Sequence, residues 1–212
     1  VCLMPMTWED GWPMVGLKGN LGRAPRTWFK PDTKLGCYGI GEEAQPVRAP
    51  YNRNEDFNGK KLGRVWQWNH NPDEKMWSLK NGRLRIQSQS AEQLMWARNT
   101  LTQRVIGPKS IATVELYVKG MKDGDVAGLG NINVPCSWIG VVKDGKQLSL
   151  RCFEQMTNDT VTVPVDIVNS KIWLRCIGEY DDNQMQYAYS TDGENFQTLG
   201  RMMPLTYQLI SF

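Results

Sequence analysis

The strongest constraint on the fold is a two-residue alternation of polar and apolar side chains that recurs after residue 80. It runs through five segments, residues 83–87, 113–118, 147–152, 171–176 and 184–189. Period-two alternation places one set of side chains on a buried sheet face and the other toward water. Turn residues, several of them Asn-Gly or Asp-Gly pairs, separate these segments and are typical of hairpins. The pattern predicts an all-β fold, a two-sheet antiparallel β-sandwich.

Two segments depart from this regular pattern. Within residues 90–105, a Ser-x-x-Gln sequence could start a helix. We nevertheless expect two strands there. The final run, residues 205–212, stops in what reads as the middle of a strand. A sandwich that ended there would leave an unpaired apolar edge, which natural sheets avoid, so we expect closing strands to be missing.

The first 53 residues differ from the rest in composition and in hydrophobic pattern. Residues 1–16 are rich in Trp, Met and Pro, whereas residues 17–53 are rich in Gly and Pro and show no apolar periodicity. The second stretch is typical of an extended connector, with the main domain starting near residue 55. The chain opens with Val1 and no leader sequence follows. We expect either a removed signal or an internal piece of a longer protein.

Charge and residue counts exclude several classes of function. The chain has 25 Lys and Arg against 22 Asp and Glu, a net charge of +3, without a basic run, so we expect no nucleic-acid partner. It has no apolar run long enough to span a bilayer, so we expect no membrane partner. His70 is the single histidine, and any triad or zinc site would depend on it. Five irregularly spaced cysteines without a Cys-x-x-Cys pair indicate buried free thiols.

Residues 65–73, with the sequence VWQWNHNPD, carry the densest set of recognition groups. Flat aromatic faces can lie against the C–H face of a sugar ring, while amides and carboxylates bond its hydroxyls. Alternation would put Trp66 and Trp68 on one face and Gln67 and Asn69 on the other. The alternative is that both indoles belong to the sandwich core and residues 69–73 form a turn held by its own side chains.

These residues resemble the C-terminal concanavalin A-like β-sandwich of glycoside hydrolase family 43. The resemblance rests on seven short motifs, at residues 55–59, 62–63, 66–73, 77–79, 97–104, 124–129 and 189–193. Residues 4–13 are similar to the closing stretch of that family's five-bladed catalytic propeller. The resemblance implies a jelly-roll sandwich at residues 54–212, a Gly/Pro-rich linker at 17–53 and a propeller remnant at 1–16.

The resemblance also implies what the parent protein does. Members of the family resemble β-xylosidases and α-L-arabinofuranosidases of xylan and arabinan, with inverting hydrolysis by paired carboxylates. Those carboxylates belong to the propeller, upstream of Val1, so no catalytic residue is assigned in this chain. The expected role is an accessory module that packs on its own catalytic propeller and shapes a pocket for xylo- or arabino-oligosaccharides. The parent enzyme is expected to be secreted or periplasmic.

Such a module commonly lends a loop to the pocket, and a polar-aromatic loop on a rigid sheet suits that role. The expected substrate or propeller contacts are Trp68, Asn69, His70, Asn71, Asp123 and Asp125. For His70, a purely structural hydrogen-bonding role is the alternative. The family also suggests a structural calcium ion, for which Asp56 is the expected ligand.

Two rival functions remain open on sequence. One is a free-standing carbohydrate-binding module for plant cell-wall polysaccharide. The other is a self-sufficient retaining β-glycanase that uses Glu179 and Asp181, two carboxylates on one strand face. A retaining enzyme requires its two carboxylates to lie about 5 Å apart. Against the second, Asp182-Asn183 directly afterwards indicates a hairpin turn.

Overall fold

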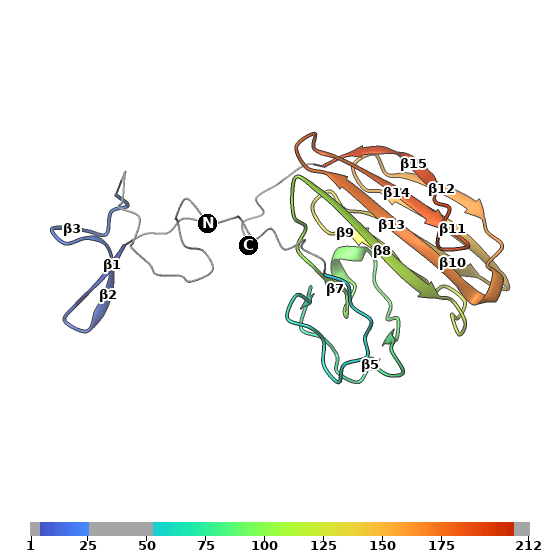
Figure 1. Ribbon diagram of the computed structural model, residues 1–212, viewed down its shortest axis with the longest axis horizontal. Coiled ribbons are helices and arrows are strands. Elements are labelled where there is room, and N and C mark those ends of the chain that lie inside the picture. The colour runs from blue at the N-terminus through green and yellow to red at the C-terminus, as the bar shows by residue number, and fades with distance from the viewer. Residues whose placement is uncertain (1–4, 26–52, 206–212) are drawn as a thin grey trace, which may run out of the picture. The chain divides into compact units, whose positions relative to one another are not determined.

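The computed structural model describes residues 5–25 and 53–205 (Figure 1). The chain divides into two compact units, Val1–Asn52 and Arg53–Phe212, and each is described by itself. Within the described ranges, no helix has the length and apolar character needed to cross a membrane.

The first unit contains a three-stranded antiparallel sheet. Strands β1 (Met6–Glu9) and β2 (Trp12–Leu17) form a hairpin, and β3 (Asn20–Leu21) pairs with β2. The hairpin turn is Asp10-Gly11, and both residues have positive φ, 50° and 80°, as the tight turn between twisted strands requires. Regular structure therefore continues into the segment predicted to be a connector from residue 17. The rest of that segment, residues 26–52, lies outside the described residues.

The second unit consists mainly of two four-stranded antiparallel sheets, which Figure 1 shows as stacked layers. One sheet has the order β12-β11-β10-β9, formed by Asp159–Pro164, Gln147–Glu154, Ser137–Asp144 and Val126–Asn131. The other has the order β15-β14-β13-β8, formed by Gln197–Pro204, Gln184–Ser190, Lys171–Glu179 and Lys109–Tyr117. The predicted two-sheet sandwich is confirmed. The 3₁₀ turn η3 (Val168–Ser170) precedes β13.

The core lies between the two sheets and follows the predicted alternation. Its members come from the inward positions of the strands and are listed together as Val118, Ile139, Val141, Leu150, Cys152, Ile172, Leu174, Met185, Tyr187, Leu199 and Met203. Burial of each large apolar side chain contributes on the order of 1.5–3 kcal/mol. All five segments with predicted alternation lie in strands: four in the two sheets and one in β6 (Leu84–Ile86).

The part of the second unit before β8 forms two small ribbons. Strand β4 (Gln67–Trp68) pairs with β7 (Leu101–Thr102), and β5 (Trp77–Leu79) pairs with β6. The expectation of two strands within residues 90–105 is wrong, because the segment holds the 3₁₀ turn η2 (Leu94–Trp96) and only the short β7. The physical reason lies in one packing contact and one backbone angle of this segment. Leu94 packs over Gly130, and Asn99 has a φ of 59°, so the backbone turns twice instead of extending.

Tyr187 places a hydroxyl group inside the apolar core. Its side chain is 0% exposed, and its hydroxyl donates to the Ser137 carbonyl oxygen at 2.9 Å. The Tyr187 hydroxyl oxygen accepts the Asn131 N–H at 3.1 Å and lies 3.0 Å from the Ser137 Oγ. One hydroxyl thus satisfies three polar groups at the edge of the opposite sheet.

Tyr187→Phe should lower the free energy of unfolding by about 1–3 kcal/mol, because the substitution leaves buried polar groups without partners. Urea unfolding followed by fluorescence measures the change. Tyr189→Phe is the matched control, since the Tyr189 hydroxyl makes one long bond of 3.4 Å to Gln197. Equal midpoints for Tyr187→Phe and the unsubstituted chain would contradict this role.

Three cysteines lie in the described part of the chain as free thiols. Cys136 and Cys152 are buried and Cys176 is half-buried, as the sequence predicted for its cysteines. Burial raises the pKa of the Cys152 thiol to about 12, and burial likewise raises the pKa of Cys176 to about 12. Cys2 and Cys37 lie outside the described residues.

In the variant Cys2→Ser/Cys37→Ser, the three remaining thiols should react very slowly with Ellman's reagent at pH 8. The reason is that the reactive species is the thiolate, and a raised pKa keeps the folded protein in the thiol form. Adding urea should release all three thiols. A thiol that reacts within seconds in the folded protein would show that burial does not protect this set.

Candidate functional site

Residues 68–73 lie against residues 93–100, and we call these two segments the loop pair. Trp68 is paired with Leu101 across β4 and β7. Beyond the strand, the Asn69 N–H donates to the Thr100 carbonyl at 3.0 Å, and Asn69 Nδ2 donates to the Met95 carbonyl at 3.3 Å. His70 Nε2 lies 2.7 Å from the same Met95 oxygen. The loop pair is therefore held by bonds that continue the β4–β7 ladder.

Asn99 fastens the far end of the loop pair. Its side chain is 2% exposed, its Oδ1 accepts the Asp73 N–H at 2.8 Å, and its Nδ2 donates to the Asp73 carbonyl at 2.9 Å. Asp73 Oδ1 in turn accepts the Lys75 N–H at 3.0 Å. A reciprocal amide clamp of this kind replaces a strand pair where the backbone is irregular. Residues 69–70 form a bend and the hydrogen-bonded turn follows at residues 74–75, so the predicted turn at residues 69–73 is displaced along the chain. Residues 69–73 are held mainly by bonds to Met95, Asn99 and Thr100 of another segment and not by their own side chains.

The two tryptophans of the motif lie outside the sandwich core. Trp66 stacks on Phe57 with ring centroids 5.9 Å apart, and Trp68 packs on Trp77 at 5.2 Å. Both are half-buried, and neither belongs to the cluster between the sheets. They form a small aromatic layer of their own, so the interpretation of these indoles as sandwich core is wrong.

The exposed part of the loop pair combines an aromatic ring with polar groups. His70, Asn71 and Arg98 are exposed, and Trp96 of η2 is 65% exposed. Trp96 was not among the residues expected from sequence, because one tryptophan in a short apolar run is equally typical of a core. The carbonyl of its neighbour Met95 is the acceptor for both Asn69 and His70, so Trp96 follows directly on the anchored position.

The His70 hydrogen bond fixes the chemistry of the ring. A carbonyl oxygen can only accept, so Nε2 must carry the proton in the 2.7 Å contact with Met95. In the neutral imidazole, Nδ1 is then an acceptor. The expected structural role of His70 and its expected contact role are therefore compatible, since one nitrogen holds the loop and the ring remains exposed.

Asp123 and Asp125 do not lie within the loop pair. Asp125 accepts the Ser88 hydroxyl at 2.6 Å and the Lys122 N–H at 2.7 Å, and Asp123 accepts the Gly145 N–H at 2.7 Å. The Ser88 hydrogen bond is the main cause that lowers the pKa of Asp125. The β5–β6 ribbon connects the two groups: Trp77 of β5 packs on Trp68, and Ser88 follows β6. Both carboxylates tie their loop to neighbouring segments, Asp125 to Ser88 and Asp123 to the turn at Gly145.

Asp56 supplies a single carboxylate whose oxygens accept bonds from the backbone N–H and the side-chain amide of Asn58, at 3.0 and 2.7 Å. These bonds lower the pKa of Asp56. Within residues 5–25 and 53–205, no three His, Cys, Asp or Glu side chains gather to hold a metal. Calcium binding at Asp56 stays a prediction, and no step below depends on it.

The two carboxylates of the rival glycanase are placed differently from one another. Glu179 ends β13 and forms an ion pair with Lys109 of β8. Asp181 lies exposed in the turn at residues 180–183, so the predicted hairpin turn is confirmed.

Comparison with known proteins identifies the sandwich. The sequence model of the β-xylosidase C-terminal concanavalin A-like domain matches residues 54–210. A β-xylosidase of Formosa agariphila is 30% identical over an alignment of 235 positions, which covers 97% of this chain and 37% of that protein.

Solved structures agree with the sequence match. A bifunctional GH43-CE protein of Bacteroides eggerthii is 31% identical with a TM-score of 0.70, over 98% of this chain and 26% of that one. An engineered GH43 glycoside hydrolase with endo-xylanase and exo-arabinofuranosidase activity is 26% identical with a TM-score of 0.65, over 96% and 42%. The chain thus spans less than half the length of each relative. It belongs to glycoside hydrolase family 43, as the C-terminal concanavalin A-like domain of its β-xylosidase-type members.

Proposed function

We propose that this chain is the accessory part of an enzyme that hydrolyses xylan- or arabinoxylan-derived glycosides, and that its loop pair packs on the catalytic domain and narrows the pocket. The observation that carries the proposal is the exposed Trp96, which directly follows the Met95 carbonyl that His70 bonds, in a segment that Asn99 fixes. A large exposed indole on a rigid support is the usual anchor of an interface or a sugar subsite.

The loop pair can act on a substrate by position alone. The Trp96 ring offers a flat face for the C–H side of a pyranose, and His70 Nδ1 offers an acceptor for a hydroxyl group. Asn71 adds an exposed amide that can both donate and accept. These groups would orient a short glycoside end and exclude water, while the acid and base come from the catalytic domain.

The first unit supports the same partner. Met6, Trp8 and Val15 are 56%, 66% and 41% exposed. Met6 and Val15 are paired across β1 and β2, and Trp8 shares their face by alternation. A three-stranded sheet with such an apolar face is stable when another surface covers it. We propose that residues 1–16 complete the catalytic propeller.

In the full-length enzyme, Trp96→Ala and His70→Ala should each lower kcat/KM for xylobiose about tenfold, equivalent to ~1.4 kcal/mol, because a positioning group is lost. Steady-state kinetics on xylobiose measure the effect, and Lys146→Ala in the exposed β10–β11 turn is the control. Unchanged kcat/KM in both loop-pair variants would refute pocket shaping.

The chain of 212 residues alone should not hydrolyse aryl β-xylosides or aryl arabinofuranosides. Release of nitrophenol over a day at high protein concentration is a sensitive measurement. If hydrolysis appeared and Glu179→Gln abolished it, the rival glycanase would replace the accessory role. Hydrolysis that persisted in Glu179→Gln would indicate a contaminant.

A further inference from the structure

The outer face of the β15-β14-β13-β8 sheet carries a row of cations and aromatic rings. Ile172 and Leu174 of β13 are 0% exposed and face the core. By alternation, Lys171, Trp173 and Arg175 point to the opposite side. Tyr117 on β8 is paired with Lys171 and shares this outer face.

The cations lie directly over the rings. Arg83 Cζ is 3.8 Å from the Tyr117 ring centroid, and Arg175 Cζ is 3.4 Å from that of Phe196. Lys171 Nζ lies 4.8 Å from Tyr117 and 5.9 Å from Trp173. Significant cation–π pairs occur roughly once per 70–80 residues. Here all the pairs found in residues 5–25 and 53–205 fall on one face, and we call it the cation–ring face.

The charges of the cation–ring face are only partly neutralised. Glu115 pairs with Lys171 at 3.1 Å, and Glu179 pairs with Lys109. Arg175 Nε donates to the neutral Thr113 hydroxyl at 3.0 Å. Among the described residues, no carboxylate lies within ion-pair distance of the Arg83 or Arg175 guanidinium group.

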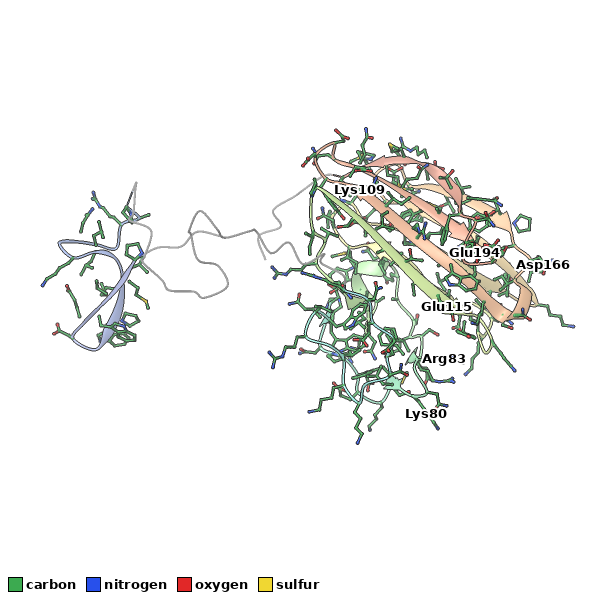
Figure 2. The ribbon with its side chains drawn as sticks, in the orientation of Figure 1. Lys80, Arg83, Lys109, Glu115, Asp166 and Glu194 are labelled. Carbon is green, nitrogen blue, oxygen red and sulfur yellow. The ribbon has the colours of Figure 1, made fainter. Side chains whose placement is uncertain are left out.

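Figure 2 shows where one of these guanidinium groups stands. Arg83 comes from the β5–β6 turn region and lies near the end of β8 that carries Glu115. Arg175 lies further along the same face, four residues after Lys171 on β13, which corresponds to about 13 Å of strand. Arg83 contacts Tyr117, the partner of Lys171, so the cations form a row and not a single point.

We infer that the cation–ring face binds an uronate-bearing polysaccharide, a xylan chain carrying glucuronic acid side groups. Guanidinium forks match carboxylates in geometry and charge. The rings hold the forks in place, so little side-chain entropy is lost on binding. A neutral sugar should bind this face more weakly, because cations already cover the ring faces of Tyr117 and Phe196 on which a sugar could stack. The choice of xylan rests on the proposed function, whereas the preference for carboxylate rests on this face.

Affinity gel electrophoresis of the 212-residue chain with glucuronoxylan tests the inference. We expect retardation by glucuronoxylan, little by linear neutral xylan, and at least a tenfold weaker affinity in Arg83→Gln/Arg175→Gln. The matched control Lys60→Gln/Lys146→Gln removes the same charge from exposed positions elsewhere and should bind normally. Raising NaCl to 0.5 M should also abolish retardation.

Equal retardation by neutral and acidic xylan, or no retardation by either, would overturn the inference. An equal loss in the control variant would show nonspecific charge attraction and would overturn it too. Circular dichroism checks folding, and the single variant Arg83→Gln, at an exposed side chain, serves if the double variant does not fold. The gel assay contains no catalytic domain, so a negative result there does not bear on the proposal that the loop pair shapes the pocket. A negative result in the kinetic test likewise does not bear on polysaccharide binding by the cation–ring face.

Discussion

Alternation within β13 is the constraint on which both the core and the outer face depend. Ile172 and Leu174 must lie on the same inward side as Tyr187 and face the opposite sheet, because they are fully buried members of one cluster. The backbone period of two then leaves no choice for the residues between them, which must face outward. A slip of one residue would bury Lys171 and Arg175 without partners, which is costly. The register that builds the core therefore also builds the cation–ring face.

The loop pair depends on a different kind of interaction. Its strands β4 and β7 are too short to define a register strongly, so side chains complete what the backbone ladder leaves open. Asn99 does this with an amide that donates and accepts at once, from a left-handed backbone that Asn adopts more readily than most residues. Such a site is rigid while its surface residues remain exposed, which suits a contact surface.

The sequence predicted the two-sheet fold well because alternation and turn residues are local signals. It placed a turn at residues 69–73, whereas the turn lies at residues 74–75, and it could not show that Asn99 clamps Asp73, since these partners are 26 residues apart. The sequence singled out Trp66 and Trp68 as candidate recognition residues. Their packing on Phe57 and Trp77 depends on contacts between separate segments, which the sequence pattern does not show. Trp96 was missed because the residues next to it in the sequence do not indicate whether its side chain is exposed. The cation–ring contacts join Arg83 and Lys171 to Tyr117, and Arg175 to Phe196, and only the tertiary fold brings these separate segments together.

Two carboxylates of the sandwich, Glu154 and Asp192, hold their surroundings in place through several hydrogen bonds each. Glu154 is 4% exposed and accepts two bonds from Arg201, at 3.0 and 2.6 Å, so the Arg201 guanidinium group neutralises its charge. Asp192 accepts bonds from Ser190, Glu194 and Asn195, and these bonds lower its pKa well below the usual range. Every carboxyl group with a shifted pKa in residues 5–25 and 53–205 is shifted downward, because hydrogen bonds favour its charged form. These carboxylates therefore stabilise the loops and strand ends that donate the bonds.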